Sequence, residues 1–162
     1  MRKTSNQIIR LIIWTLYFIQ SLIYVVAGSI HLDEGAYMYA SKAVYLGKLP
    51  YRDFFFLQPP VHPYIYGLFQ KLSPGLLTGR LTSVLLGSIS ILVLAKLVER
   101  QCNHKSASLL FLALIAMTPF QIYFFTITRL YALTTLFIAV GSYLLFSTKK
   151  PSLIRWTIGL PI

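Results

Sequence analysis

Apolar residues form four long runs that are separated by shorter, more polar segments. The runs cover residues 11–28, 80–98, 107–125 and 130–147. Each run lies in or near the range of ~17 to 25 residues that a helix needs to cross a bilayer, and Pro119 in the third run is a kink that a membrane helix tolerates. The pattern therefore predicts an all-α membrane protein with about four transmembrane helices.

The first apolar run could be either a cleaved signal peptide or a permanent membrane anchor. Its apolar stretch is longer than the core of a usual signal peptide, and Ala27-Gly28-Ser29 is a poor cleavage site. We therefore interpret residues 11–28 as a membrane helix that stays in the chain.

The loop between the first two predicted membrane helices, residues 29–79, carries its own helical signals. Asp33 is a good N-cap for a helix over residues 34–46, and Gly47 is a typical C-terminal stop. A second segment, residues 60–72, has about 12 helical residues, or ~18 Å, against a hydrocarbon core of ~30 Å. We expect one or two juxtamembrane helices in this loop.

Lysine and arginine residues flank the apolar runs and predict how the chain is oriented. If residues 60–72 do not span, nine of the fifteen basic residues are cytoplasmic, whereas only six are if they do. The nine are Arg2, Lys3, Arg10, Lys96, Arg100, Lys105, Lys149, Lys150 and Arg155. The prediction is a multi-pass cell-membrane protein with a cytoplasmic N-terminus, residues 1–10, and an extracytoplasmic loop 29–79. Residues 148–162 are expected to form a cytoplasmic tail or the start of a further, truncated helix.

The composition excludes several classes of function. Apolar residues make up 56% of the chain and charged residues 12%, so the net charge of +11 reflects membrane topology rather than a nucleic-acid-binding face. None of the four runs has a charge at its centre, which argues against a transporter or channel. Cys102 is the only cysteine, and the only acids are Asp33, Glu34, Asp53 and Glu99.

Five short motifs follow one another in an order that resembles a known family. They are His31-Leu32-Asp33-Glu34-Gly35, Leu49-Pro50-Tyr51-Arg52-Asp53, Gln58-Pro59-Pro60, Gly79-Arg80-Leu81 and Thr128-Arg129-Leu130. The order is similar to the amino-terminal part of the polytopic GT-C glycosyltransferases, which include protein O-mannosyltransferases and aminoarabinose transferases. The resemblance covers nearly the whole chain but only about the first third of a typical member. It implies inverting transfer of a hexose or pentose from a polyprenyl-phosphate donor to an acceptor hydroxyl outside the cytoplasm.

The resemblance also implies roles for individual residues. Asp33 would be the catalytic base and Glu34 its neighbour in the catalytic site. Arg80 and Arg129 would lie near the donor phosphate, because guanidinium groups match phosphate geometry and stay charged. We further predict substrate contacts for Asp53, Gln58 and His62. The implied partners are a lipid-linked sugar and the bilayer, with a second chain completing the bundle as a further option.

Each assignment has a simpler alternative. Asp33 could be only a helix cap, Asp53 could close a turn with Arg52, and both arginines could anchor helix ends. No cofactor is expected; the alternative is a divalent cation bound by His31 and His62 with the acids. Thr134 and Gln58 depart from the pattern of many relatives, which favours the alternative of a truncated, non-catalytic remnant or membrane subunit.

Overall fold

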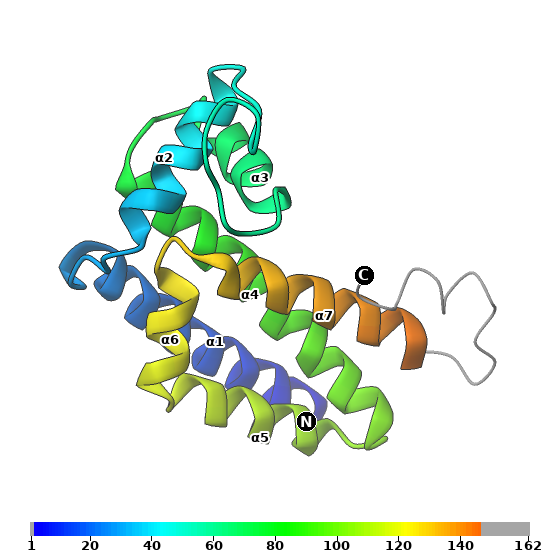
Figure 1. Ribbon diagram of the computed structural model, residues 1–162. Helices are drawn as coiled ribbons and strands as arrows, with labels where there is room; N and C mark the ends of the chain where they lie inside the picture. Colours follow the sequence, from blue (N-terminus) through cyan, green and yellow to red (C-terminus); the bar gives the residue numbers. More distant parts are fainter. Residues whose placement is uncertain (1, 147–162) are drawn as a thin grey trace.

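The computed structural model describes residues 2–146, and every regular element in this range is a helix. The helices are α1 (Arg2–Ala27), α2 (Glu34–Tyr45), α3 (Val61–Gln70), α4 (Leu76–Gln101), α5 (Lys105–Ala116), α6 (Pro119–Thr126) and α7 (Leu130–Phe146). Helices α1, α4, α5 and α7 run beside one another, and α2 and α3 pack together at one end of this bundle (Figure 1). The prediction of an all-α membrane protein is confirmed.

The apolar helices differ in how well they match the thickness of a membrane. Residues Gln7–Ala27 of α1 and the whole of α4 are long and apolar enough to cross, and α5 with α6 makes a third span if the bent pair is counted as one. Helix α7 has 17 residues, or ~26 Å at 1.5 Å per residue. Residues 2–146 therefore contain two helices with the length and composition of a membrane span, a bent pair that adds a third if it is counted as one, and one shorter apolar helix.

The bend between α5 and α6 is larger than the mild kink expected at Pro119. The two helices differ in direction by 75°. Thr118 has extended backbone angles, φ −104° and ψ 94°, and Pro119 begins a new helix. A residue before proline is disfavoured in the helical region, and proline fits the first turn of a helix. Residues 107–125 consequently form two helices that meet at a corner.

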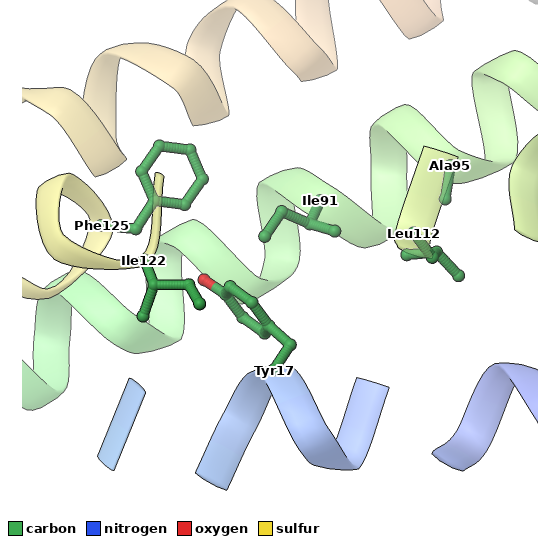
Figure 2. Close-up of a cluster of buried hydrophobic side chains, with 6 residues drawn as sticks. All are labelled: Tyr17, Ile91, Ala95, Leu112, Ile122 and Phe125. Carbon is green, nitrogen blue, oxygen red and sulfur yellow. The ribbon is translucent and has the colours of Figure 1, made fainter. Parts of the chain in front are cut away.

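Two clusters of buried side chains hold the helices together. The first joins α1, α4, α5 and α6 and consists of Tyr17, Ile91, Ala95, Leu112, Ile122 and Phe125 (Figure 2). The second joins α3, α4 and α7 through Tyr66, Leu86, Ala132 and Leu133. Because both clusters include α4, this helix fixes the positions of α6 and α7, and with them the short connection at residues 127–129.

Helix α2 has nearly the bounds that its sequence signals predict. Gly47 adopts φ +86°, its N–H donates to Val44 O at 2.9 Å, and Lys48 N donates to Ala43 O at 3.0 Å. This pair of bonds is a Schellman motif, which ends a helix at a glycine. The predicted second loop helix is α3, which packs against α2. The predicted tail, residues 148–162, lies outside the described residues.

The opposite end of the bundle is fixed by an ion pair. Nη2 of Arg10 lies 2.6 Å from Oε2 of Glu99 and donates to Oγ of Ser108 at 2.5 Å. The three residues belong to α1, α4 and α5, so the pair joins these helices far from α2 and α3 (Figure 1).

Candidate active site at the start of α2

Asp33 and Glu34 lie where four parts of the chain meet: the end of α1, the start of α2, the start of α4 and the connection before α7. Glu34 is completely buried, with 0% of its side chain exposed, whereas 50% of the Asp33 side chain is exposed. The two neighbouring acids therefore occupy different environments and have different partners.

Glu34 forms a two-pronged ion pair with Arg80 at the start of α4. Nε of Arg80 donates to Oε1 at 3.0 Å, and Nη2 donates to Oε2 at 2.8 Å. The backbone N–H of Thr128 donates to Oε1 and that of His31 to Oε2, both at 2.9 Å. Both carboxylate oxygens are thus bonded inside the protein, and Glu34 links α4 to the connection between α6 and α7.

Arg80 also binds the carboxyl end of α1. Nη1 donates to the carbonyl oxygens of Val25 at 3.1 Å and Gly28 at 3.0 Å, and Nη2 donates to that of Ser29 at 2.9 Å. The last carbonyl groups of a helix lack partners within the helix and carry partial negative charge. Arg80 is buried and donates hydrogen bonds to these carbonyl groups. All three nitrogen atoms of its guanidinium group therefore already have partners inside the protein.

The ion pair controls the ionisation of Glu34. Burial on its own would raise the pKa of this carboxyl group, but hydrogen bonds from Arg80, from the backbone of Thr128 and from that of His31 outweigh it, and the pKa is lowered. Hydrogen bonds that favour the charged form of a carboxyl group act in this direction. Glu34 is therefore a charged, fully bonded residue.

Asp33 occupies the N-cap position of α2 but its side chain makes no capping hydrogen bond. Instead, Oδ2 lies 2.9 Å from Nη2 of Arg129 and 4.0 Å from Nδ1 of His31. The alternative that Asp33 serves only as a cap is not supported by this geometry. The acid lies at the surface, paired with an arginine that comes from the other half of the chain.

The guanidinium group of Arg129 lies between two tyrosine rings. Its Cζ atom is 6.0 Å from the ring centroid of Tyr37 and 5.1 Å from that of Tyr131, distances at which a cation is attracted to a ring face. Burial raises the pKa of Tyr37, while Arg129 opposes this effect. Because 22% of the Arg129 side chain is exposed, it is the arginine of the predicted pair that can meet a ligand.

Sequence reasoning missed both tyrosines. Tyr37 follows Asp33 by four residues, one helical turn, and Tyr131 follows Arg129 by two. The helical spacing of Asp33 and Tyr37 was a usable signal, since residues four apart lie on the same face. No signal in the sequence indicated that Arg129 would lie between the two rings.

Two other predicted substrate contacts, Asp53 and Gln58, bond to residues of their own loop. Asp53 closes its turn with Arg52, at 2.8 Å, and accepts from Leu49 N, and these bonds lower its pKa to about 2. Gln58 is exposed, and its backbone oxygen accepts from the Tyr51 hydroxyl at 2.5 Å.

His62 is fully buried, with 0% exposed, and burial lowers its pKa to about 3. A direct contact between His62 and a substrate would require α3 to move. Within residues 2–146, no three or more His, Cys, Asp or Glu side chains are grouped so that they could hold a metal ion.

Gly79 permits the close contact between α4 and residue 128. A Cβ atom at this position would lie 2.7 Å from Oγ1 and 2.9 Å from Cγ2 of Thr128, and 2.5 Å from Sδ of Met38. We expect Gly79→Ala to lower the free energy of unfolding by about 1–3 kcal/mol, as overpacking does. Thermal unfolding in detergent measures this, with Gly35→Ala as the control, because a Cβ there meets nothing within 4 Å. Equal stability of the two variants would contradict the close contact.

Comparison with known proteins identifies the family but not an individual relative. Residues 57–162 match the dolichyl-phosphate-mannose-protein mannosyltransferase family, and the match includes Arg80 and Arg129 but not Asp33 and Glu34. No curated protein and no solved structure matches the chain. The matched segment covers well over half of the chain. The chain therefore belongs to the dolichyl-phosphate-mannose-protein mannosyltransferase family.

Proposed function

We propose that the protein is a membrane glycosyltransferase that moves a sugar from a polyprenyl-phosphate donor to an acceptor hydroxyl group. The observation that carries this proposal is the half-exposed Asp33 carboxylate, held 2.9 Å from the partly exposed Arg129. One group can accept a proton and the other can bind a phosphate, and they lie side by side at one end of the membrane bundle. The family supports the same class of reaction.

The reaction that fits these groups is a single displacement at the anomeric carbon. Asp33 accepts the proton of the acceptor hydroxyl as its oxygen forms a bond to the sugar carbon. The bond between that carbon and the phosphate oxygen breaks, and its electron pair leaves with the polyprenyl phosphate. Arg129 binds the negative charge of this leaving group through charge-assisted hydrogen bonds. One displacement inverts the configuration of the sugar.

The exchange of partners on Arg129 is part of this proposal. In the structure its Nη2 atom lies 2.9 Å from Oδ2 of Asp33, and the other partner of this carboxylate, Nδ1 of His31, lies farther away at 4.0 Å. A phosphate that binds Arg129 competes with the carboxylate for the same guanidinium group. Donor binding would thus release Asp33 to act as a base.

We propose supporting roles for Glu34 and Arg80 rather than direct contacts with substrate. Their charged atoms are bonded to each other, to backbone N–H groups and to the carbonyl groups at the end of α1. The hydrogen bond from Thr128 N to Glu34 fixes the backbone of Thr128, which directly precedes Arg129. The pair therefore sets the position of Arg129 relative to Asp33.

The proposed orientation places this end of the bundle outside the cytoplasm. The end of α1, the start of α4 and the connection before α7 meet at the start of α2, so the two acid–arginine pairs lie at the same end of the bundle (Figure 1). The basic residues favour a cytoplasmic N-terminus. A lipid-linked donor in the outer leaflet would reach the pair from the bilayer.

Replacing Arg129 with glutamine is expected to weaken binding of a prenyl phosphate by about 10- to 100-fold, because a charge-assisted hydrogen bond is lost. The measurement is the dissociation constant of farnesyl phosphate for the purified full chain in detergent. Lys48→Gln is the control, since it removes one positive charge from the loop between α2 and α3, whereas Arg129 lies between α6 and α7. Unchanged binding by Arg129→Gln would overturn the proposed phosphate site.

The alternative function is a non-catalytic subunit of the same family. Thr134 supports it, because the family resemblance implies an acid at this position, and here it is an exposed threonine on α7. This alternative predicts that farnesyl phosphate binds but that no sugar is transferred by the full chain from any polyprenyl-phosphate sugar. Measured transfer would exclude it.

A further inference from the structure

Tyr37 belongs to a buried stack of three rings, which we call the aromatic column: Tyr37, His62 and Tyr66. The Tyr37 ring meets the His62 ring edge-on, with centroids 4.9 Å apart and planes at 67°. His62 lies flat on Tyr66, with centroids 4.0 Å apart and planes at 19°. Since Tyr37 also contacts the guanidinium group of Arg129, the column extends from the interior of the protein to the candidate site.

The far end of the column returns to the backbone next to Arg129. The Tyr66 hydroxyl lies 2.9 Å from Oγ of Ser83, and Ser83 donates to the carbonyl oxygen of Ile127 at 2.9 Å. The same carbonyl oxygen accepts the backbone N–H of Arg129 at 2.8 Å. The column thus contacts the Arg129 side chain at Tyr37. Its other end is linked to the Arg129 backbone through Ser83 and the carbonyl group of Ile127.

His62 contributes a ring face rather than polar atoms to this column. Neither of its ring nitrogens has a hydrogen-bond partner, and the residue is fully buried. A buried polar atom without a partner is destabilising. The stabilising contacts of His62 are therefore those of its ring, which stacks on Tyr66 and meets the edge of Tyr37. A phenylalanine ring could make both contacts.

We infer that the aromatic column and Tyr131 position Arg129 for its anionic ligand, with Tyr37 and Tyr131 as the two residues that contact the guanidinium group. This inference rests on the proposed role of Arg129. An arginine side chain has many rotamers, and fixing one before the ligand arrives reduces the entropy lost on binding. His62 and Tyr66 act through Tyr37 and are positioning residues.

The first test is the affinity of the full chain for farnesyl phosphate. Tyr37→Leu and Tyr131→Leu are each expected to raise its dissociation constant by roughly 2- to 30-fold, the range that a cation–π contact supports. His62→Phe keeps the ring stacked between Tyr37 and Tyr66 and should leave the constant within about twofold of the original. Tyr39→Leu is the matched control, because this tyrosine is exposed on the same helix and contacts Phe54 instead.

A double-mutant cycle separates positioning from a general effect on the fold. If the tyrosines act through Arg129, Tyr131→Leu should have no further effect once Arg129 is glutamine. Tyr131 is used here because its ring is exposed, so its loss leaves the buried column intact. Equal weakening by Tyr131→Leu with and without Arg129 would overturn the inference.

The same binding measurements distinguish a failure of the inference from a failure of the proposed function. Weaker binding by Arg129→Gln with unchanged binding by both tyrosine variants would overturn the positioning role alone. Unchanged binding by Arg129→Gln would overturn the phosphate site itself. Weakening by Tyr131→Leu that disappears in the Arg129→Gln background supports both.

Discussion

Replacing Asp33 with asparagine is expected to reduce sugar transfer by about 10²- to 10⁴-fold, the usual contribution of a positioned general base. Asparagine has nearly the same shape as aspartate but does not accept the proton of the acceptor hydroxyl. Binding of farnesyl phosphate should be retained or become tighter, because the variant removes the carboxylate that competes for Arg129. The measurement is the rate of transfer from a polyprenyl-phosphate sugar, followed beside the dissociation constant of farnesyl phosphate.

The fold should tolerate this substitution. Half of the Asp33 side chain is exposed, and it makes no capping hydrogen bond to α2. An exposed ion pair contributes only about 0–1 kcal/mol, so thermal unfolding should change little. Glu99→Gln is the control for loss of an acid, since Glu99 binds Arg10 at the other end of the bundle. Full activity of Asp33→Asn would exclude this residue as the base.

The sequence predicted those helices whose bounds depend on nearby residues, such as an apolar run, an N-cap or a terminal glycine. The apolar runs mark α1, α4 and α7, and Asp33 and Gly47 mark the two ends of α2. The bend at Pro119 was underestimated, because a proline can leave a helix kinked or end it, and the surrounding packing decides which. In this fold, Ile122 and Phe125 on α6 are buried against α1 and α4, which holds the second half at its angle.

The sequence grouped the two neighbouring acids with Arg80 and Arg129, but it did not indicate which acid pairs with which arginine. Sequence reasoning placed both acids and both arginines on one side of the membrane. It did not predict that Glu34 would pair with Arg80 and Asp33 with Arg129, because neighbouring residues on a helix point in directions that differ by ~100°. That rotation sends Glu34 into the protein and leaves Asp33 at the surface, so the two acids have different partners.

Removing the Glu34 carboxylate is expected to destabilise the protein strongly. Glu34→Ala leaves the buried guanidinium group of Arg80 without its counter-charge, a change that typically costs about 3–5 kcal/mol. Thermal unfolding of the purified chain in detergent measures the loss. Asp53→Ala, which breaks the exposed pair with Arg52, should be close to neutral for stability. Similar stability of the two variants would contradict a structural role for Glu34.

A double variant tests whether the stability comes from the pair or from Glu34 alone. Glu34→Leu combined with Arg80→Met removes both buried charges, and such replacements are often much less harmful than removal of one partner. We expect the double variant to be more stable than Glu34→Leu, even though Arg80 also binds the carbonyl groups at the end of α1. A double variant less stable than Glu34→Leu would show that those carbonyl contacts outweigh the ion pair.

The pH dependence of stability gives an independent check on the same pair. The pKa of Glu34 is lower in the folded protein than its ordinary value of 4.5, so the folded state favours the charged form. Its contribution is therefore fully present above pH 4.5 and is lost as the pH falls through the lowered pKa. The stability difference between the original protein and Glu34→Gln should shrink on acidification below that value. Asp53 also titrates in acid, but it is present in both proteins and its effect cancels in the difference. A difference that stays constant down to the acid limit of folding would show that charge on Glu34 does not hold the site together.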